Sequence, residues 1–167
     1  LNHSLFRRLA WILAGLTLAL NIGTLVLGLL NQYAPLYLAF MITAVSAAVV
    51  GGVIGWRQPA NRVGWIIAGF ALCFTLGEFS RQYTMFAVFT RPGSLPFFSL
   101  IASPVYWAWY PGLMLMFVFL PLFFPTGRLV SPRWRPVSWT AVLATFLLIV
   151  LALVTPGDGE ITGFPNP

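Results

Sequence analysis

The stretch RQPANRVGWIIAGFALCFTLGEFSRQYTMFAVF, residues 57–89, begins with a short polar connection between Arg57 and Arg62 and continues as a long apolar run. A helix needs about 20 apolar residues to cross a hydrocarbon core about 30 Å thick. The run from Val63 to Phe89 exceeds this length. We therefore expect a transmembrane helix that extends past the hydrocarbon at its far end.

Two further apolar runs precede this stretch and two follow it, at residues 9–30, 36–56, 105–124 and 137–154. The 167 residues are 59% hydrophobic and 7% charged, with a mean hydropathy of +0.89. A soluble domain of this size could not cover so large an apolar content with polar surface. We therefore predict an all-α integral membrane protein, in which residues 1–167 form a single transmembrane domain, a bundle of five helices.

The arginines predict the orientation of these spans, because cytoplasmic loops of membrane proteins collect positive residues. All nine basic residues are arginines, and seven lie in three segments that alternate with nearly uncharged connections. These seven are Arg7, Arg8, Arg57, Arg62, Arg128, Arg133 and Arg135, whereas Arg81 and Arg91 belong to the opposite side. The pattern predicts an N-terminus in the cytoplasm and a C-terminus outside.

Polar residues of the first three spans are expected in one layer, outward of the membrane midplane. A helical rise of about 1.5 Å per residue places Asn21, Thr43 and Thr75 about 18 to 20 Å above the cytoplasmic boundary, with Glu78 slightly higher. Such groups should face each other in hydrocarbon. Arg81, one turn beyond Glu78, favours a structural ion pair. A carboxyl that changes protonation or binds a ligand is the alternative.

Small residues at i, i+4 spacing suggest close helix packing, because lipid supplies no hydrophobic force to hold spans together. The stripes are Gly15/Ala19/Gly23, Ala47/Gly51/Gly55 and Gly69/Cys73/Gly77. They predict a tight bundle of the first three helices.

Aromatic residues gather at the outer end of the fourth span. They are Tyr106, Trp107, Trp109 and Tyr110. An interfacial belt at the headgroup level is the favoured interpretation, and a ligand-stacking cluster is the alternative. Pro111 follows them and removes a backbone hydrogen bond, so we expect a bend in that helix.

The net charge of +6 lies mostly on the predicted cytoplasmic side. Anionic lipid headgroups attract each arginine there by about 1 kcal/mol, so the charge does not indicate a nucleic-acid partner. The residues expected to contact lipid phosphate or a protein partner are Arg57, Arg62, Arg128, Arg133, Trp134 and Arg135. Interfacial anchoring is the favoured interpretation.

No catalytic set can be assembled from this sequence. His3 is the only histidine, Cys73 the only cysteine, and Glu78 the only acidic residue within a predicted span. Nucleophilic triads, paired carboxylates and glycine-rich phosphate loops are therefore not found. We predict no enzyme, no metal site and no cofactor, although a lipid, pigment or quinone could be held by packing.

Two loop sequences carry a resemblance. Residues 122–139, LFFPTGRLVSPRWRPVSW, and residues 57–66, RQPANRVGWI, are similar to loops of the six-transmembrane N-terminal sensor region of bacterial two-component histidine kinases. The resemblance covers about residues 35–167, with Thr126 where the family usually has Asp. It implies a location in the bacterial cytoplasmic (inner) membrane. It also implies a sixth span and a kinase core, which would lie beyond Pro167.

The favoured hypothesis is a non-catalytic sensor or signal-input module, which resembles the histidine-kinase sensor region and acts by rearranging helices. The alternative is an accessory or structural subunit packed against a larger photosynthetic or respiratory membrane complex. A small transporter is disfavoured, because inverted repeats and a broken mid-membrane helix are not evident. The expected partners are anionic lipids and either other membrane subunits or a missing C-terminal part.

Overall fold

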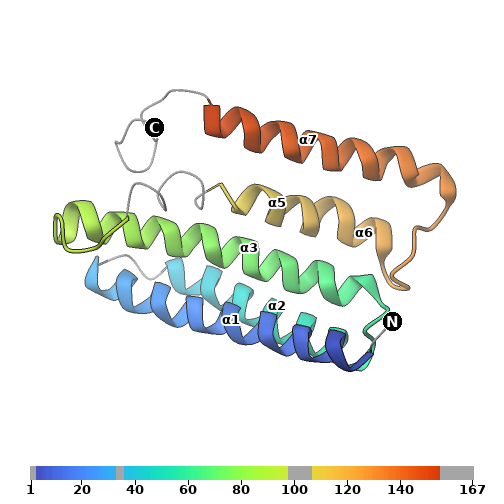
Figure 1. Cartoon of the computed structure of the whole chain (residues 1–167), viewed down its shortest axis with the longest axis horizontal. Helices are drawn as coiled ribbons and strands as arrows, with labels where there is room; N and C mark the ends of the chain where they lie inside the picture. Colours follow the sequence, from blue (N-terminus) through green and yellow to red (C-terminus); the bar gives the residue numbers. More distant parts are fainter. Residues whose placement is uncertain (1–2, 33–35, 98–106, 155–167) are drawn as a thin grey trace.

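A computed structural model of the chain describes residues 3–32, 36–97 and 107–154, and within these residues every regular element is helical (Figure 1). The elements are α1 (His3–Leu30), α2 (Leu36–Arg57), α3 (Arg62–Met85), the π-helix η1 (Phe86–Thr90), α5 (Trp109–Met114), the π-helix η2 (Leu115–Phe119), α6 (Leu120–Phe123), the 3-10 helix η3 (Pro132–Trp134) and α7 (Arg135–Val154).

Four helical stretches are long and apolar enough to cross a membrane, namely Ser4–Leu30, Ala39–Arg57, Arg62–Thr90 and Pro132–Leu151. They match four of the predicted spans, including the long third one. A further apolar helix, Trp109–Phe123, is shorter and lies within the predicted fourth span. The all-helical prediction is therefore confirmed for the described residues, together with four helices of spanning length.

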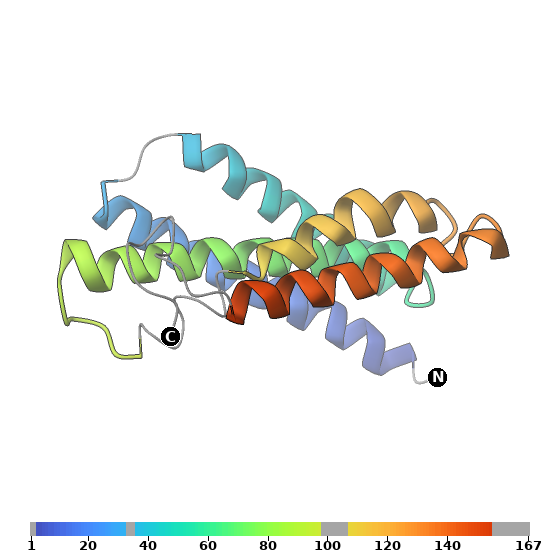
Figure 2. The ribbon, with the colours of Figure 1, turned by 90° about the horizontal axis from the view of Figure 1, so that it is seen from above.

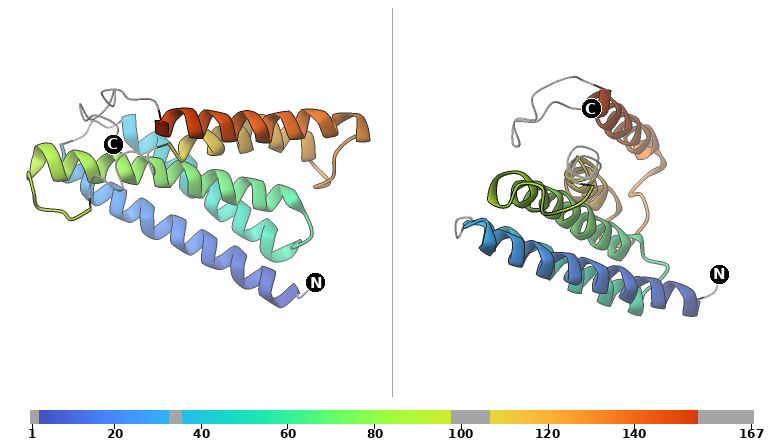
Figure 3. Two further views of the ribbon diagram at one scale, coloured as in Figure 1. Left: turned by 45° about the horizontal axis from the view of Figure 1, so that its top comes forward. Right: turned by 60° about the vertical axis from the view of Figure 1, so that its left-hand side comes forward.

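Helix α3 lies in the middle of the molecule. It packs against α1 and α2 on one side and against α5 on the other, and α7 lies outermost beside α5 (Figures 1 and 3). Buried residues accordingly run along nearly its whole length. They are Val63, Gly64, Ile66, Ala68, Phe70, Ala71, Thr75, Gly77, Ser80, Gln82 and Thr84.

One end of the bundle collects the starts of α1, α3 and α7 and the ends of α2 and α6 (Figures 1 and 2). Seven of the nine arginines lie in these helix ends or in the connection between α6 and α7, which includes η3, so we call it the arginine end. Helix α1 begins earlier than predicted, at His3, and therefore includes Arg7 and Arg8.

Glycines allow α2 and α3 to approach closely, as predicted for the second stripe. A Cβ atom on Gly51 would lie 2.5 Å from the backbone nitrogen of Ala68. One on Gly64 would lie 2.8 Å from the backbone nitrogen of Gly55. No side chain fits at either position unless a helix backbone moves, so these glycines set the distance between the two helices.

The other two stripes were assigned partly to the wrong surfaces. Gly15 is exposed and has nothing within 4 Å of its Cβ position. Helix α1 instead buries Ala10 and Ala14. On α3, a Cβ on Gly69 would lie 3.1 Å from Leu115 of η2, so that stripe faces the segment around α5 and not the first two helices. Spacing revealed close-packing positions but not which neighbour each one meets.

The predicted bend at Pro111 is also wrong. Helix α5 begins at Trp109, so Pro111 lies in its first turn, where a backbone N–H would lack an intrahelical acceptor. The irregularity follows instead at η2, where the backbone changes to π-helical geometry.

Replacing Gly51 with alanine should destabilise the bundle by about 1–3 kcal/mol, because its Cβ must displace the α3 backbone. The matched variant Gly15→Ala adds the same methyl group to an open surface and should change stability by less than about 0.5 kcal/mol. Unfolding free energies measured in bicelles would test this, and equal effects of the two variants would contradict the close α2–α3 contact.

Candidate functional site

A line of buried polar residues runs between α1 and α3, and we call it the polar seam. At its centre the Asn21 side-chain amide donates to Thr75 Oγ1 at 2.9 Å and to the Thr17 carbonyl at 3.0 Å. Asn21 is 4% exposed and Thr75 2%. Thr17 and Thr24, also buried, each donate to a carbonyl one turn earlier in α1. Each of these buried groups thus has a partner, as an apolar environment requires.

Toward the end of the bundle opposite the arginine end, the polar seam continues between Asn31, Gln82 and Thr90. The Asn31 amide donates to both the backbone carbonyl and the side-chain oxygen of Gln82, at 3.0 and 2.9 Å. Thr90 of η1 donates to the Asn31 side-chain oxygen at 2.5 Å. Gln82 is fully buried, and its Nε2 has no hydrogen-bond partner among the described residues. These bonds fasten the end of α1 to α3 and η1.

The predicted pairing of Glu78 is confirmed, since Arg81 approaches Glu78 Oε2 at 2.9 Å through Nη2 and 3.2 Å through Nε. The Glu78 side chain is 26% exposed and the Arg81 side chain 11%. The predicted inward position of Thr43 is wrong. Thr43 is exposed on α2, where its hydroxyl donates to the Ala39 carbonyl at 3.0 Å, so it needs no partner from another helix. The polar layer thus joins two helices and not three.

At the arginine end, two loops that are distant in sequence meet. Gly127 is buried with φ +74, and a Cβ there would lie 2.5 Å from Asn61 Oδ1 and 2.7 Å from the Arg62 backbone nitrogen. Asn61 also caps α3, accepting from the Val63 N–H at 3.0 Å. We call this the loop contact. It joins the two segments whose sequences carry the family resemblance.

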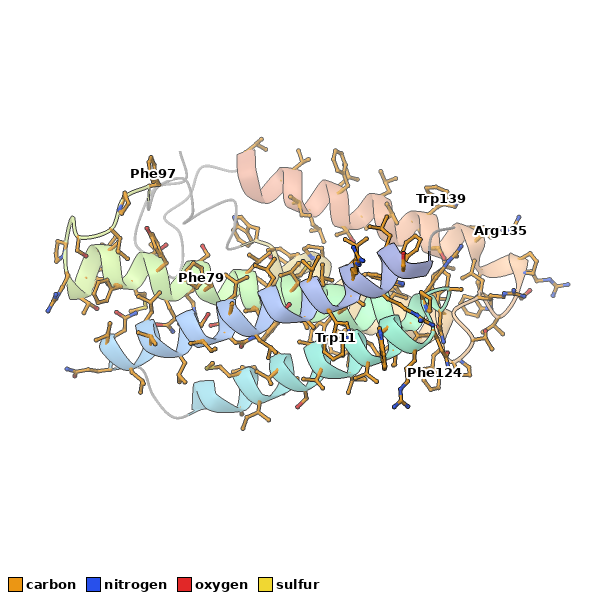
Figure 4. The ribbon with its side chains drawn as sticks, turned by 60° about the horizontal axis from the view of Figure 1, so that its bottom comes forward. Trp11, Phe79, Phe97, Phe124, Arg135 and Trp139 are labelled. Atoms are coloured by element: carbon orange, nitrogen blue, oxygen red, sulfur yellow. The ribbon has the colours of Figure 1, made fainter. Side chains whose placement is uncertain are left out.

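Beside the loop contact lies a cavity of about 380 Å³, which we call the arginine pocket. Its lining residues are Ala60, Arg62, Gly127, Arg128, Leu129, Pro132 and Arg135. Three of the arginines predicted to contact phosphate or a partner therefore share one cavity. Figure 4 shows Arg135 and Phe124 at this end of the molecule, away from Phe97 at the other end.

The remaining predicted contact residues of this side, Arg57, Arg133 and Trp134, are exposed and do not line the pocket. The guanidinium carbon of Arg62 lies 5.5 Å from the centre of the Phe123 ring. This contact lies between the start of α3 and the end of α6, beside the loop contact.

The predicted aromatic belt is described in part, since Tyr106 lies outside the described residues. Tyr110 stacks on both tryptophans, with ring centres 5.2 Å from Trp107 and 4.1 Å from Trp109. Trp109 Nε1 is buried and has no hydrogen-bond partner among the described residues. The rings thus stack on each other at the start of α5.

Several of these residues were missed by sequence reasoning. Asn31, Gln82 and Thr90 lie near span ends. Polar residues are common there, so their presence does not indicate a contact. Gly127 and Asn61 lie in the two loops that carry the resemblance, but nothing in their spacing indicated that the loops touch. Within the described residues, no group of three His, Cys, Asp or Glu side chains could hold a metal ion.

Comparisons of the chain with protein-family models, with curated proteins and with solved structures return no significant match. The candidate sites are therefore defined by their own chemistry, an internal polar seam and a cationic pocket.

The Asn21–Thr75 bond should show a coupling free energy of about 0.6 kcal/mol, and at most about 1.7 kcal/mol, in a double-mutant cycle. The cycle compares Asn21→Leu, Thr75→Val and the double variant by unfolding in bicelles. Thr43→Val is the matched control and should change stability by less than about 0.5 kcal/mol, because its hydroxyl bonds only within α2. A coupling of zero would contradict the interhelical bond.

The loop contact predicts unequal effects for two glycines of similar backbone geometry. Gly93 has φ +75 with nothing within 4 Å of its Cβ position, whereas Gly127 has φ +74 and meets Asn61 and Arg62. Gly93→Ala should cost about 1–2 kcal/mol from the left-handed conformation alone. Gly127→Ala should cost at least about 1 kcal/mol more, because the loops must also separate. Equal losses in unfolding free energy would show that the loops do not touch.

Proposed function

We propose that the chain is a non-catalytic signal-input module of a bacterial inner membrane, with five spans and the arginine end in the cytoplasm. The observation that carries the proposal is the position of α3, which joins the polar seam to the loop contact. A movement of α1 against α3 at Asn21 and Thr75 reaches Arg62 through a single helix. The loop contact then relays it toward η3 and α7.

The bonding pattern along the polar seam suits two alternative helix positions. Hydroxyl and amide groups can exchange partners between a neighbouring helix and a carbonyl of their own helix, as Asn21 already contacts both. Such exchange keeps each polar group paired while the helices shift. The Glu78–Arg81 pair lies one turn beyond Thr75 on α3 and is the charged element of this mechanism.

The function can be tested by sequencing the gene downstream of the codon for Pro167. A sixth apolar span followed by a histidine-kinase core supports the signal-input module. In such a full-length protein, Asn21→Leu should change kinase output, while Thr43→Val should leave it unchanged. A stop codon together with stable co-purification of bioenergetic subunits would refute the proposal.

One observation favours the alternative, an accessory subunit of a larger membrane complex. Helix α7 exposes large apolar side chains, including Phe146 at 62% and Trp139 at 73%, and Trp139 is labelled in Figure 4. In the alternative, a partner subunit covers this surface and reduces its contact with lipid.

The five-span orientation predicts opposite labelling of two introduced cysteines in a Cys73→Ser background. Val130→Cys, at a position 75% exposed at the arginine end, should react with an impermeant maleimide only from the cytoplasmic side. Glu160→Cys should react only from outside. The reason is that seven arginines lie on the predicted cytoplasmic side and two on the opposite side, and cytoplasmic loops collect positive residues. Labelling of both cysteines from the same side would contradict the predicted orientation.

A further inference from the structure

The arginine pocket is lined by three arginines, and none of its lining residues is acidic. Arg62, Arg128 and Arg135 line it. The only acidic residue among the described residues is Glu78, which lies within α3 and pairs with Arg81. Like charges that share a cavity repel one another, and an anion within it would relieve this repulsion. The charge distribution therefore favours an anionic occupant.

Two helix starts add to the positive potential of the pocket. Arg62 is the first residue of α3 and Ala60 precedes its N-cap, while Pro132 and Arg135 are the first residues of η3 and α7. Neither α3 nor α7 carries an acidic residue in its first turn. The positive end of the helix dipole lies at the N-terminus and favours anions, while Asn61 and Ser131 accept hydrogen bonds from N–H groups at these two starts. Backbone and side chains thus favour the same charge.

The shape and rigidity of the pocket suit a phosphate group. A volume of about 380 Å³ lies within the range of small-molecule sites and exceeds what one water fills. Guanidinium groups bind phosphate through paired, charge-assisted hydrogen bonds. The guanidinium carbon of Arg62 also lies 5.5 Å from the centre of the Phe123 ring, a contact that favours a subset of its side-chain conformations.

We propose that the arginine pocket binds the phosphate group of an anionic ligand, held by Arg62, Arg128 and Arg135. The site lies at the end of the helices of spanning length, where a phospholipid headgroup and a free phosphate compound could both reach it. The proposal does not rest on the signal-input function, since an accessory subunit could use the same site.

Arg133 distinguishes this site from simple interfacial anchoring. It belongs to the same loop as Arg128 and Arg135 and is exposed, but it does not line the pocket. Anchoring by snorkelling side chains would use all arginines of the loop alike. A built site would depend on those that line the cavity.

The experiment titrates the purified full chain with phosphatidylglycerol, phosphatidylcholine and inorganic phosphate, and measures bound adducts by native mass spectrometry. We expect preference for phosphatidylglycerol over phosphatidylcholine if the ligand is a lipid, and direct binding or competition by phosphate if it is soluble. In either case Arg62→Gln, Arg128→Gln and Arg135→Gln should each weaken binding about 10-fold or more. Arg133→Gln should change it less than about 2-fold.

Two outcomes would overturn the proposal. One is binding of neither anionic probe in preference to phosphatidylcholine, and the other is equal weakening by Arg133→Gln and Arg135→Gln. Thermal unfolding of each variant separates lost binding from lost folding. Arg128 is exposed on its loop, so Arg128→Gln keeps the test decisive if a variant at a helix start fails to fold.

Discussion

In hydrocarbon, an amide or hydroxyl without a partner destabilises the fold, and this constraint organises the contact between α1 and α3. The Asn21 side chain can be buried in α1 only where another polar group meets it, and Thr75 of α3 is that group. The bond fixes both the rotation of α1 about its axis and its position along α3. The Asn31–Gln82 bonds fix the same relation near the other end of α1.

Once α1 and α3 are aligned, the remaining contacts follow from close packing. Gly51 and Gly64 bring α2 against α3, and Gly112 of α5 packs against Cys73 on the opposite side of α3. The arginine end depends on the same helix, because Asn61 and Arg62 at the start of α3 form one half of the loop contact. The pocket for an anion is therefore built on the helix that the polar seam holds.

Much of the fold could be predicted from the sequence, because span length and apolar content are local properties. The ends of α2, and those of α3 taken together with η1, lie within one residue of the predicted spans 36–56 and 63–89. The contact faces were harder to predict, because the face a helix buries depends on its neighbour. Gly15 and Ala14 are adjacent, and Ala14 is the buried one because it meets Gly52 of α2, a contact that the spacing within α1 did not indicate.

Among the candidate sites, too, local features could be predicted and features that depend on neighbouring helices could not. The Glu78–Arg81 pair lies within one helix, and its spacing alone predicted it. The polar residue Thr43 has the same depth as Asn21, but depth gives no information about rotation, and its own helix satisfies the hydroxyl. The arginine pocket depends on loops that meet because α6 packs against α3, so composition indicated its charge but not its shape.

The central claim, that a polar bond aligns α1 with α3, can be measured by solid-state NMR of the isotope-labelled chain in lipid bilayers. The side-chain nitrogen of Asn21 should give through-space cross-peaks to Thr75 of α3 and to Thr17 of its own helix, since both acceptors lie at about 3 Å. The Thr17 cross-peak serves as an internal control for the ordering of the side chain. A spectrum with the Thr17 cross-peak and without the Thr75 cross-peak would contradict the account.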